Sequence, residues 1–282
     1  MRQTSQSNTR PTQRSPSMHY APAVVLTLMC APIIAGAQDR DRDGDLRWER
    51  RLSAGQHVHV RNINGDISVT PSSSGRVEIV GVRRGSTRYA DRLTAEVTET
   101  SDGIMVCVVR RDSSDECDGR GYHTHDDDDN WGNASLNLEI RLPSSLEIDA
   151  TSVSGNVDVV GAQGDVRATS VSGDIRLERL RATSVEAHSV SGGISASVES
   201  LSGSGPLSFK TVSGDVKLEL PRGLDADLSM SSVSGQLDSE FQMTLGGRAA
   251  SRRRIEARIG RGGRELNLTT VSGDVRLRMT HE

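Results

Sequence analysis

Alternating apolar and polar positions recur along the chain in short, nearly identical segments. In residues 169–177 one alternating set is apolar or small and the other is polar: Val171, Gly173, Ile175 and Leu177 against Ser170, Ser172, Asp174 and Arg176. A period of two places successive side chains on opposite faces of a β-strand. The pattern therefore predicts one half-buried strand per segment. The segments are residues 151–159, 169–177, 188–196, 210–218, 231–239 and 269–277, with a related one at 61–69.

Each segment carries a central glycine, and the glycines recur at intervals of about 20 residues. They are Gly155, Gly173, Gly192, Gly214, Gly235 and Gly273, preceded by Gly65 in the related segment. One strong strand per period near 20 residues is typical of a solenoid. The last interval is about twice the others, so residues 254–259 are interpreted as a degenerate copy. The prediction is an all-β, β-solenoid or β-helix-like repeat domain over residues 146–280.

Residues 46–145 also alternate but lack the strict repeat. We expect strands at residues 46–52, 57–61, 66–70, 76–83, 93–98, 104–110 and 135–142. A long polar loop, residues 111–134, separates the last two. This region is predicted to be a less regular, β-sandwich-like domain that covers one end of the solenoid.

Charges on the polar face favour parallel, in-register stacking of the segments. Opposite charges on neighbouring strands stabilise a sheet, whereas like charges destabilise it. In the order of the sequence, Asp158 would face Arg176 and Lys217 would face Asp238.

The N-terminus has the layout of an export signal. Arg2, Arg10 and Arg14 precede an uncharged apolar stretch at residues 21–35, and a small-x-small site ends at Ala37. Residues 1–37 are predicted to be a signal peptide, although Met18 is an alternative start, and residues 38–45 a flexible charged segment. We expect export to the periplasm, outer surface or medium. No long apolar run follows, so no transmembrane span is expected after signal removal.

Composition excludes some partner classes. Removing residues 1–37 takes away three of 34 basic residues and none of the 38 acidic ones, leaving 31 − 38 = −7. So acidic a protein has no overall field to attract nucleic acid, and we expect none as partner. Aromatic residues are 2% of the chain, so the core should consist of thin β layers filled by small aliphatic side chains.

Two cysteines remain after the predicted signal, Cys107 and Cys117. In an exported chain a disulfide between them is the favoured interpretation, with two free thiols as the alternative.

The motifs resemble those of the bacterial putative-adhesin family of β-strand-repeat domains. The resemblance rests on the repeated T-V-S-G-D-V-x-L, on N-I-N-G-D-I-S-V at residues 62–69, and on the ending at residues 259–277; it covers roughly residues 46–279. It implies an exported or surface-associated β-solenoid linked to adhesion or envelope stress. The family supplies no catalytic residues, and the acidic loop here departs from its pattern.

Three segments contain metal-binding residue types. In the acidic loop, His123, His125, Asp126 and Asp127 are candidate ligands for a divalent cation, against the alternative of a solvated mobile loop. His57 and His59 share one face of a strand, but no nearby carboxylate or third histidine is evident, so a surface strand is favoured. The third segment, residues 39–46, resembles the start of a calcium loop, but Arg50 stands where the bidentate acid is expected, so a flexible terminus is favoured.

A binding function fits this sequence better than catalysis. No serine lies in a G-x-S-x-G elbow, and two Trp and two Phe are few for sugar platforms, so we expect no enzyme and no cofactor. An arginine-rich run, comprising Arg248, Arg252, Arg253, Arg254, Arg258, Arg261 and Arg264, could contact an anionic polymer or simply balance the acidic remainder. The leading hypothesis is an exported envelope binding or scaffold protein whose partner is an envelope protein, glycan or surface polymer. An envelope-stress sensor acting through a partner protein is the alternative, and a polysaccharide-active enzyme is less favoured.

Overall fold

The computed structural model describes residues 39–40, 46–112, 116–118, 121–123, 133–251 and 253–280. The chain divides into two units, residues 1–35 and residues 36–282, and every described residue belongs to the second. The predicted signal peptide therefore lies outside the described residues. Those described form strands and one short helix, α1 (Thr87–Ala90), as the all-β prediction requires.

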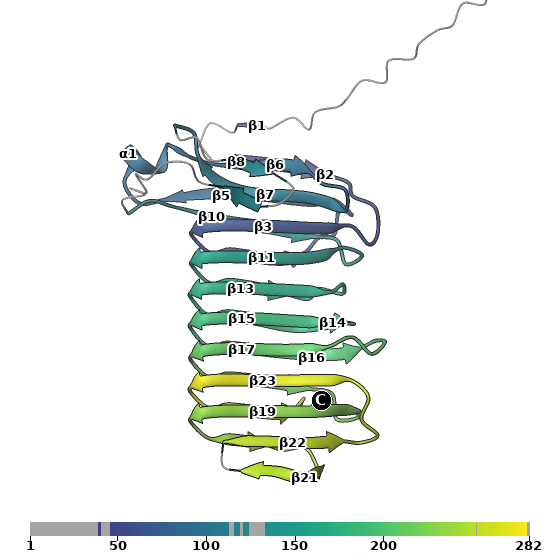
Figure 1. The fold of residues 1–282 in the computed structure, drawn as a ribbon. Helices are drawn as coiled ribbons and strands as arrows, with labels where there is room; N and C mark the ends of the chain where they lie inside the picture. The colour runs from purple at the N-terminus through teal and green to yellow at the C-terminus, as the bar shows by residue number, and fades with distance from the viewer. Residues whose placement is uncertain are drawn as a thin grey trace, which may run out of the picture. The chain divides into compact units, whose positions relative to one another are not determined.

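Two eleven-stranded sheets contain nearly all strands of the described residues. Sheet A contains, in spatial order, β1 (Asp39–Arg40), β2 (Leu46–Arg50), β5 (Val77–Arg84), β10 (Ser135–Leu142), β4 (Ile67–Pro71), β12 (Val157–Val160), β14 (Ile175–Ala182), β16 (Ile194–Leu201), β18 (Val216–Leu220), β24 (Val275–Met279) and β20 (Leu237–Ser239). Sheet B contains β21 (Met243–Ser251), β22 (Arg254–Ile259), β19 (Ala226–Ser234), β23 (Glu265–Ser272), β17 (Leu207–Ser213), β15 (Val185–Ser191), β13 (Val166–Ser172), β11 (Glu147–Ser154), β3 (His57–Asn64), β7 (Gly103–Arg110) and β6 (Leu93–Glu99). Figure 1 shows the succession of sheet B strands. A third sheet pairs β8 (Glu116–Asp118) with β9 (Gly121–His123).

Each repeated segment contributes a strand to both sheets, rather than forming a single strand as predicted. The chain leaves sheet B after Ser172 and enters sheet A at Ile175, so Gly173 and Asp174 form a corner. The inward face changes phase at that corner. Ser170 is buried and Val171 is exposed, whereas Ile175 and Leu177 are buried, so the predicted face is correct only after the glycine.

The corner glycines stack so closely that a side chain would not fit. A Cβ added at Gly173 would lie 2.6 Å from the carbonyl carbon of Gly155, and one at Gly192 would lie 2.6 Å from that of Gly173. Real Cβ atoms essentially never approach carbon this closely. The recurring glycine is therefore required by backbone contact between successive coils. The same proximity occurs at Gly65, Gly155, Gly214, Gly235 and Gly273.

Hydrogen bonds between coils satisfy the polar groups at this corner. The buried hydroxyls of Ser170 and Thr211 donate to the carbonyls of Gly155 and Gly192, at 2.9 and 2.8 Å. Beside them, the amides of Asp174 and Gly193 each donate, at 2.9 Å, to a side-chain oxygen of the preceding coil, on Asn156 and Asp174. Buried serine is tolerated because its hydroxyl is bonded.

The core lies between the two sheets and is almost entirely aliphatic. In one coil Val166 and Ala168 point inward from sheet B, and Ile175 and Leu177 from sheet A; all four are buried. Phe209 is the largest of the fully buried side chains in the described part. The prediction of thin layers filled by small side chains is confirmed.

The coils do not follow the order of the sequence at the C-terminal end. Strand β23 lies between β17 and β19, and β24 lies between β18 and β20, so the last segment is inserted before the one that precedes it. Residues 254–259 are not a degenerate coil, because β22 pairs antiparallel with β19 and forms part of the end of the sheet.

This insertion changes the predicted charge pairing. Asp158 lies opposite Arg176 as predicted, with an ion pair of 3.5 Å. Lys217, however, lies opposite Arg276 and not Asp238. The two like charges are tolerated because Arg276 forms ion pairs with Asp215 and Asp274, at 3.0 and 2.5 Å.

The N-terminal region continues the same two sheets. All seven strands predicted between residues 46 and 142 are present, with ends within three residues of those expected. Antiparallel pairing of β2, β5 and β10 extends sheet A, while β6 and β7 extend sheet B. The turn between β6 and β7, residues 100–102, therefore lies beside β3 and the first coil.

Candidate binding surfaces

Six valines form an exposed apolar stack along the corner between the sheets. Each is the valine of a repeated segment, and each is 42–57% exposed: in spatial order, Val153, Val171, Val190, Val212, Val271 and Val233. Parallel pairing on either side of them, such as Ser152 with Ser170 and Ser154 with Ser172, brings successive valines level with one another. Neighbouring strands lie about 4.8 Å apart, so the stack is continuous. We call these six residues the valine ridge.

The outer face of sheet B carries alternating charge across its strands. His59, Asp149, Arg167 and Glu186 lie side by side on β3, β11, β13 and β15. Arg167 and Glu186 form an ion pair of 3.2 Å. A hollow of about 310 Å³ opens over this part of the sheet, lined by both histidines of β3 and by several carboxylates.

Three carboxylates surround the histidines of β3. His59 Nε2 lies 3.2 Å from Asp102 Oδ2, and His59 Nδ1 lies 3.4 Å from Asp149 Oδ2. His57 Nε2 lies 3.3 Å from Glu147 Oε2, and the two imidazole rings stack with centroids 5.5 Å apart. The expectation that no carboxylate lies nearby was therefore wrong. Within the described residues, His57, His59 and Asp102 are the one group of three ligand-bearing side chains whose atoms lie within 4.8 Å of one another.

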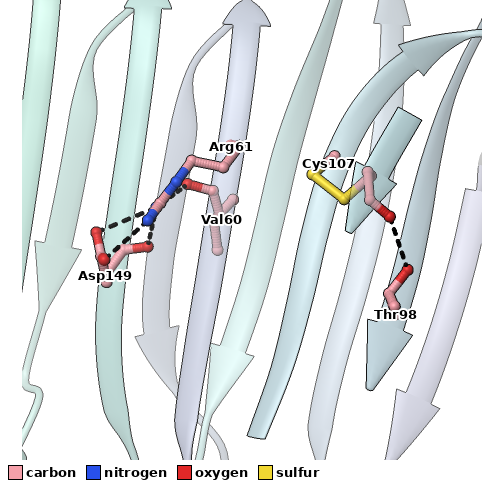
Figure 2. The surroundings of a disulfide bond; sticks show 6 residues. Val60, Arg61, Thr98, Cys107 and Asp149 are labelled. Atoms are coloured by element: carbon pink, nitrogen blue, oxygen red, sulfur yellow. Dashed lines mark hydrogen bonds and ion pairs between the residues drawn. A yellow bond between two sulfur atoms is a disulfide. The ribbon is translucent and has the colours of Figure 1, made fainter. Parts of the chain in front are cut away.

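Neighbouring residues hold two of these carboxylates in place. Arg61 donates to both oxygens of Asp149, at 3.1 and 2.9 Å, as Figure 2 shows. Thr100 donates to Asp102 Oδ1 at 2.7 Å, and the pKa of Asp102 is lowered by this hydrogen bond and by its contact with His59. Both carboxylates therefore have fixed orientations beside His59.

The two cysteines predicted to pair lie at the edge of the same region. Cys107 on β7 and Cys117 on β8 have their Cα atoms 5.8 Å apart and their sulfur atoms bonded (Figure 2). Thr98 donates to the carbonyl of Cys117 at 3.3 Å. The bond connects the segment after residue 112 to the buried strand β7.

The metal site predicted in the acidic loop cannot be placed in the structure. His123 is the last residue of β9, with its side chain not described, and His125, Asp126 and Asp127 lie outside the described residues. The calcium-like segment also lies largely outside them.

The arginine-rich run is mostly engaged within the protein. Arg258 and Arg261 form ion pairs with Asp227 and Asp225, at 3.2 and 2.7 Å. Arg254 pairs with Glu256 at 2.5 Å. Arg264 is only 6% exposed and donates to four backbone carbonyls, those of Thr183, Ser202, Gly203 and Gly205. Arg264 is thus a structural residue, and the ion pairs of Arg254, Arg258 and Arg261 balance acidic side chains, which is the second of the two interpretations of the run.

Sequence reasoning missed the valine ridge and the carboxylates of the histidine cluster. The alternation of residues 169–177 predicts an inward valine, and it continues unbroken through the glycine that marks the corner. The carboxylates lie 43 and 90 positions away from His59, so only the register of the sheet brings them together.

No described helix is long and apolar enough to cross a membrane.

The chain is similar to a domain family and to solved structures of two bacterial proteins. No curated protein matches the chain. A solved structure of a putative cell adhesion protein from Clostridium sporogenes aligns at 7% identity and a TM-score of 0.47, covering 83% of this chain and 99% of that one. A putative adhesin from Bacteroides fragilis aligns at 12% identity and a TM-score of 0.34, covering 84% and 97%. The Toastrack DUF4097 family model matches residues 40–278, nearly the whole described fold, and the chain belongs to that family.

Proposed function

We propose that the protein is an exported, adhesin-like binding protein of the bacterial envelope that holds its partner along the repeated surface of the coil. The valine ridge carries the proposal. Six valines exposed in one strip present on the order of 400 Å² of apolar surface, in the range where patches on soluble proteins are often binding sites. The adhesin names of the structurally aligned proteins agree with this proposal, but they do not carry it.

A long ridge suits an extended partner better than a small molecule. Exposed serines adjoin the ridge at every coil, such as Ser172 and Ser191, so each coil offers an apolar contact and a hydroxyl in the same arrangement. A partner with its own repeat, such as a surface glycan or an extended envelope protein, can engage several coils at once. Multiple weak contacts of this kind add through effective concentration.

The proposal includes no catalytic step. The buried hydroxyls of the repeat, including those of Ser152, Ser170 and Thr211, are committed to glycine carbonyls of the preceding coil. Their role is to join coils, and a hydroxyl that donates to a fixed carbonyl is not positioned as a nucleophile.

The decisive experiment changes the ridge without changing the backbone. Replacing Val171, Val190 and Val212 with threonine keeps three β-branched side chains but exchanges three methyl groups for hydroxyls. At about 0.8 kcal/mol for each apolar group removed, binding of the purified chain to envelopes of its source organism should weaken at least tenfold. Unchanged binding by a folded triple variant would refute the role of the ridge.

A matched control tests whether any surface change has the same effect. Arg181 and Glu199 form an exposed ion pair of 3.0 Å on sheet A, away from the ridge, and the double change to glutamine should leave binding intact. Export is tested separately, by fractionating cells that express the whole chain. We expect the exported form to begin at Gln38, and retention in the cytoplasm with residue 1 or 18 as its start would overturn that part.

A further inference from the structure

The histidine cluster on β3 has the donor types of a transition-metal site. His57 and His59 supply imidazole nitrogens, and Asp102 supplies a carboxylate from the turn between β6 and β7. Imidazole favours zinc, copper and nickel, whereas calcium and magnesium prefer sites made wholly of oxygen. The mixture of donors therefore points to a borderline divalent ion of the zinc class.

The spacing of the donor atoms is close to what zinc requires. Ligands at about 2.0–2.1 Å from a tetrahedral zinc ion lie roughly 3.3 Å from one another. His59 Nε2 and Asp102 Oδ2 are 3.2 Å apart. His57 lies farther away, within 4.8 Å, and its side chain, 36% exposed, must turn out of its stack on His59 to join the pair. Glu147 lies 3.3 Å from His57 but is not part of this group of three.

The surroundings of His59 match the usual support of a metal-bound histidine. Such a histidine commonly uses one ring nitrogen for the metal and donates the other N–H to a carboxylate. Here Nε2 faces Asp102, and Nδ1 faces Asp149 at 3.4 Å. Asp149 is in turn fixed by two hydrogen bonds from Arg61. This chain of contacts orients His59 independently of any bound ion.

The turn that carries Asp102 is also fixed next to the histidines. The amide of His57 donates to the carbonyl of Asp102 at 2.9 Å. Thr100 holds Asp102 Oδ1, so Oδ2 is the oxygen directed at His59. His59 and Asp102 are therefore arranged before an ion arrives, which reduces the cost of binding.

We propose that His57, His59 and Asp102 bind a divalent transition-metal ion of the zinc class. The ion would join β3 to the β6–β7 turn. It would thereby connect the first coil to the antiparallel strands that cover that end of the sheet. This site is separate from the valine ridge, so it does not depend on the proposed binding function.

The test is titration of the purified, untagged whole chain with Zn²⁺ by isothermal calorimetry, with a thermal melt in parallel. We expect a site that is weakened at least 100-fold in the double variant His57→Ala/His59→Ala and at least tenfold in Asp102→Asn. The rise in melting temperature caused by zinc should disappear in the same variants. Ca²⁺ and Mg²⁺ should produce no heat that depends on these residues.

Two control variants identify the location of the ion. His188 lies on the same face of sheet B beside Lys210 and Arg167, so His188→Ala should bind zinc normally. His123→Ala/His125→Ala removes both histidines of the acidic loop and should also leave this site intact. Loss of zinc in the loop variant but not in the His57/His59 variant would overturn the proposal, as would no binding at all.

If no zinc binds, the cluster is a set of polar contacts in which His59 lies between Asp102 and Asp149. The variants would then lose stability without any effect of zinc, and the melting curves would show this directly.

Discussion

Substituting one of two adjacent glycines should destabilise the coil, while substituting the other should not. A Cβ at Gly192 would lie 2.6 Å from the carbonyl carbon of Gly173 and closer still to its oxygen. A Cβ at Gly193 would meet the carbonyl oxygen of Asp215 at 3.4 Å and Asp174 Oδ1 at 3.8 Å, which are ordinary contacts. The two positions therefore differ in space, although they are neighbours in the chain.

The magnitude follows from what must move. To accommodate a methyl group at Gly192, its coil must separate from that of Gly173, which strains the bonds from Ser189 Oγ to Gly173 O (3.2 Å) and from the Gly173 amide to Ser191 O (3.1 Å). Overpacking costs about 1–3 kcal/mol, and each hydrogen bond weakened costs up to about 1 kcal/mol. The lower entropy of the unfolded alanine chain offsets about 0.4–1 kcal/mol. We expect Gly192→Ala to lower the free energy of unfolding by roughly 3 kcal/mol.

Equilibrium unfolding in urea, followed by far-UV circular dichroism, measures the difference. Gly193→Ala should unfold within about 0.5 kcal/mol of the parent, or be slightly more stable. If the two variants lose similar stability, backbone proximity is not the reason for the repeated glycine. If Gly192→Ala is as stable as the parent, the stacking at the corner is looser than the structure shows.

Four further predictions concern other parts of the coil. Gly193→Asn should raise the free energy of unfolding by about 0.5–1.5 kcal/mol in the same urea assay, because its side-chain oxygen can accept the Asp215 amide as Asp215 accepts that of Asp274. Arg264→Met should lower the free energy of unfolding by about 3–5 kcal/mol, because four backbone carbonyls lose their donor. Arg264→Lys should lower it by less, because the lysine ammonium can still donate to at least two of these carbonyls. The pKa of Asp215 is lowered from 3.8 by the Asp274 amide and by Arg276, so its contribution is complete above pH 3.8 and is lost as pH falls below it; Asp215→Asn should flatten the acid limb of a plot of melting temperature against pH. Reduction of the Cys107–Cys117 bond, or the double change to alanine, should lower stability by about 2–4 kcal/mol, measured as a lower melting temperature with than without a thiol reductant.

The repeat and its strands were predictable because their signals are local. Alternation at residues 57–61 or 135–142 reports burial on one face of a strand, and the glycine interval reports the length of a coil. The change of the inward-facing set of residues at the corner, which leaves Val171 exposed and Ser170 buried, was not predictable in the same way. Alternation runs unbroken through residues 169–177, and only the corner decides that Ser170 turns inward. Burial of that serine is possible because the glycine of the preceding coil presents a carbonyl to its hydroxyl.

The site on β3 illustrates a different limit. The spacing of His57 and His59 shows that they share a face, but the partners Asp102, Glu147 and Asp149 come from a distant turn and from a parallel strand. Pairing of β11 with β3 places Asp149 opposite His59 and Glu147 opposite His57. A shift of the register by one residue would remove both contacts. Aligning residues 61–69 with residues 151–159 on their glycines gives this register, but the two segments are far apart in the sequence, and only the fold makes them neighbours.

The inserted last coil makes the same contacts with its neighbours as the other coils make with theirs. Contacts between coils therefore do not determine the spatial order of the coils, and we look for the cause in the strands at the end of the solenoid. Thr270 donates to Gly214 O and Ser232 donates to Gly273 O, both at 2.9 Å, which repeats the contact made between coils that are consecutive in the sequence. The coil formed by β19 and β20 differs in having a three-residue strand in sheet A and the antiparallel β22 on its sheet B edge. Short edge strands and covered edges limit pairing with other chains, whereas the longer β23 and β24 have partners on both sides. Placing the last segment inside and the shorter one outside therefore leaves the end of sheet A with the smaller unpaired edge. Under the proposed function, the partner would contact side chains of the valine ridge and the outer faces, and not the free backbone groups of a long end strand in sheet A.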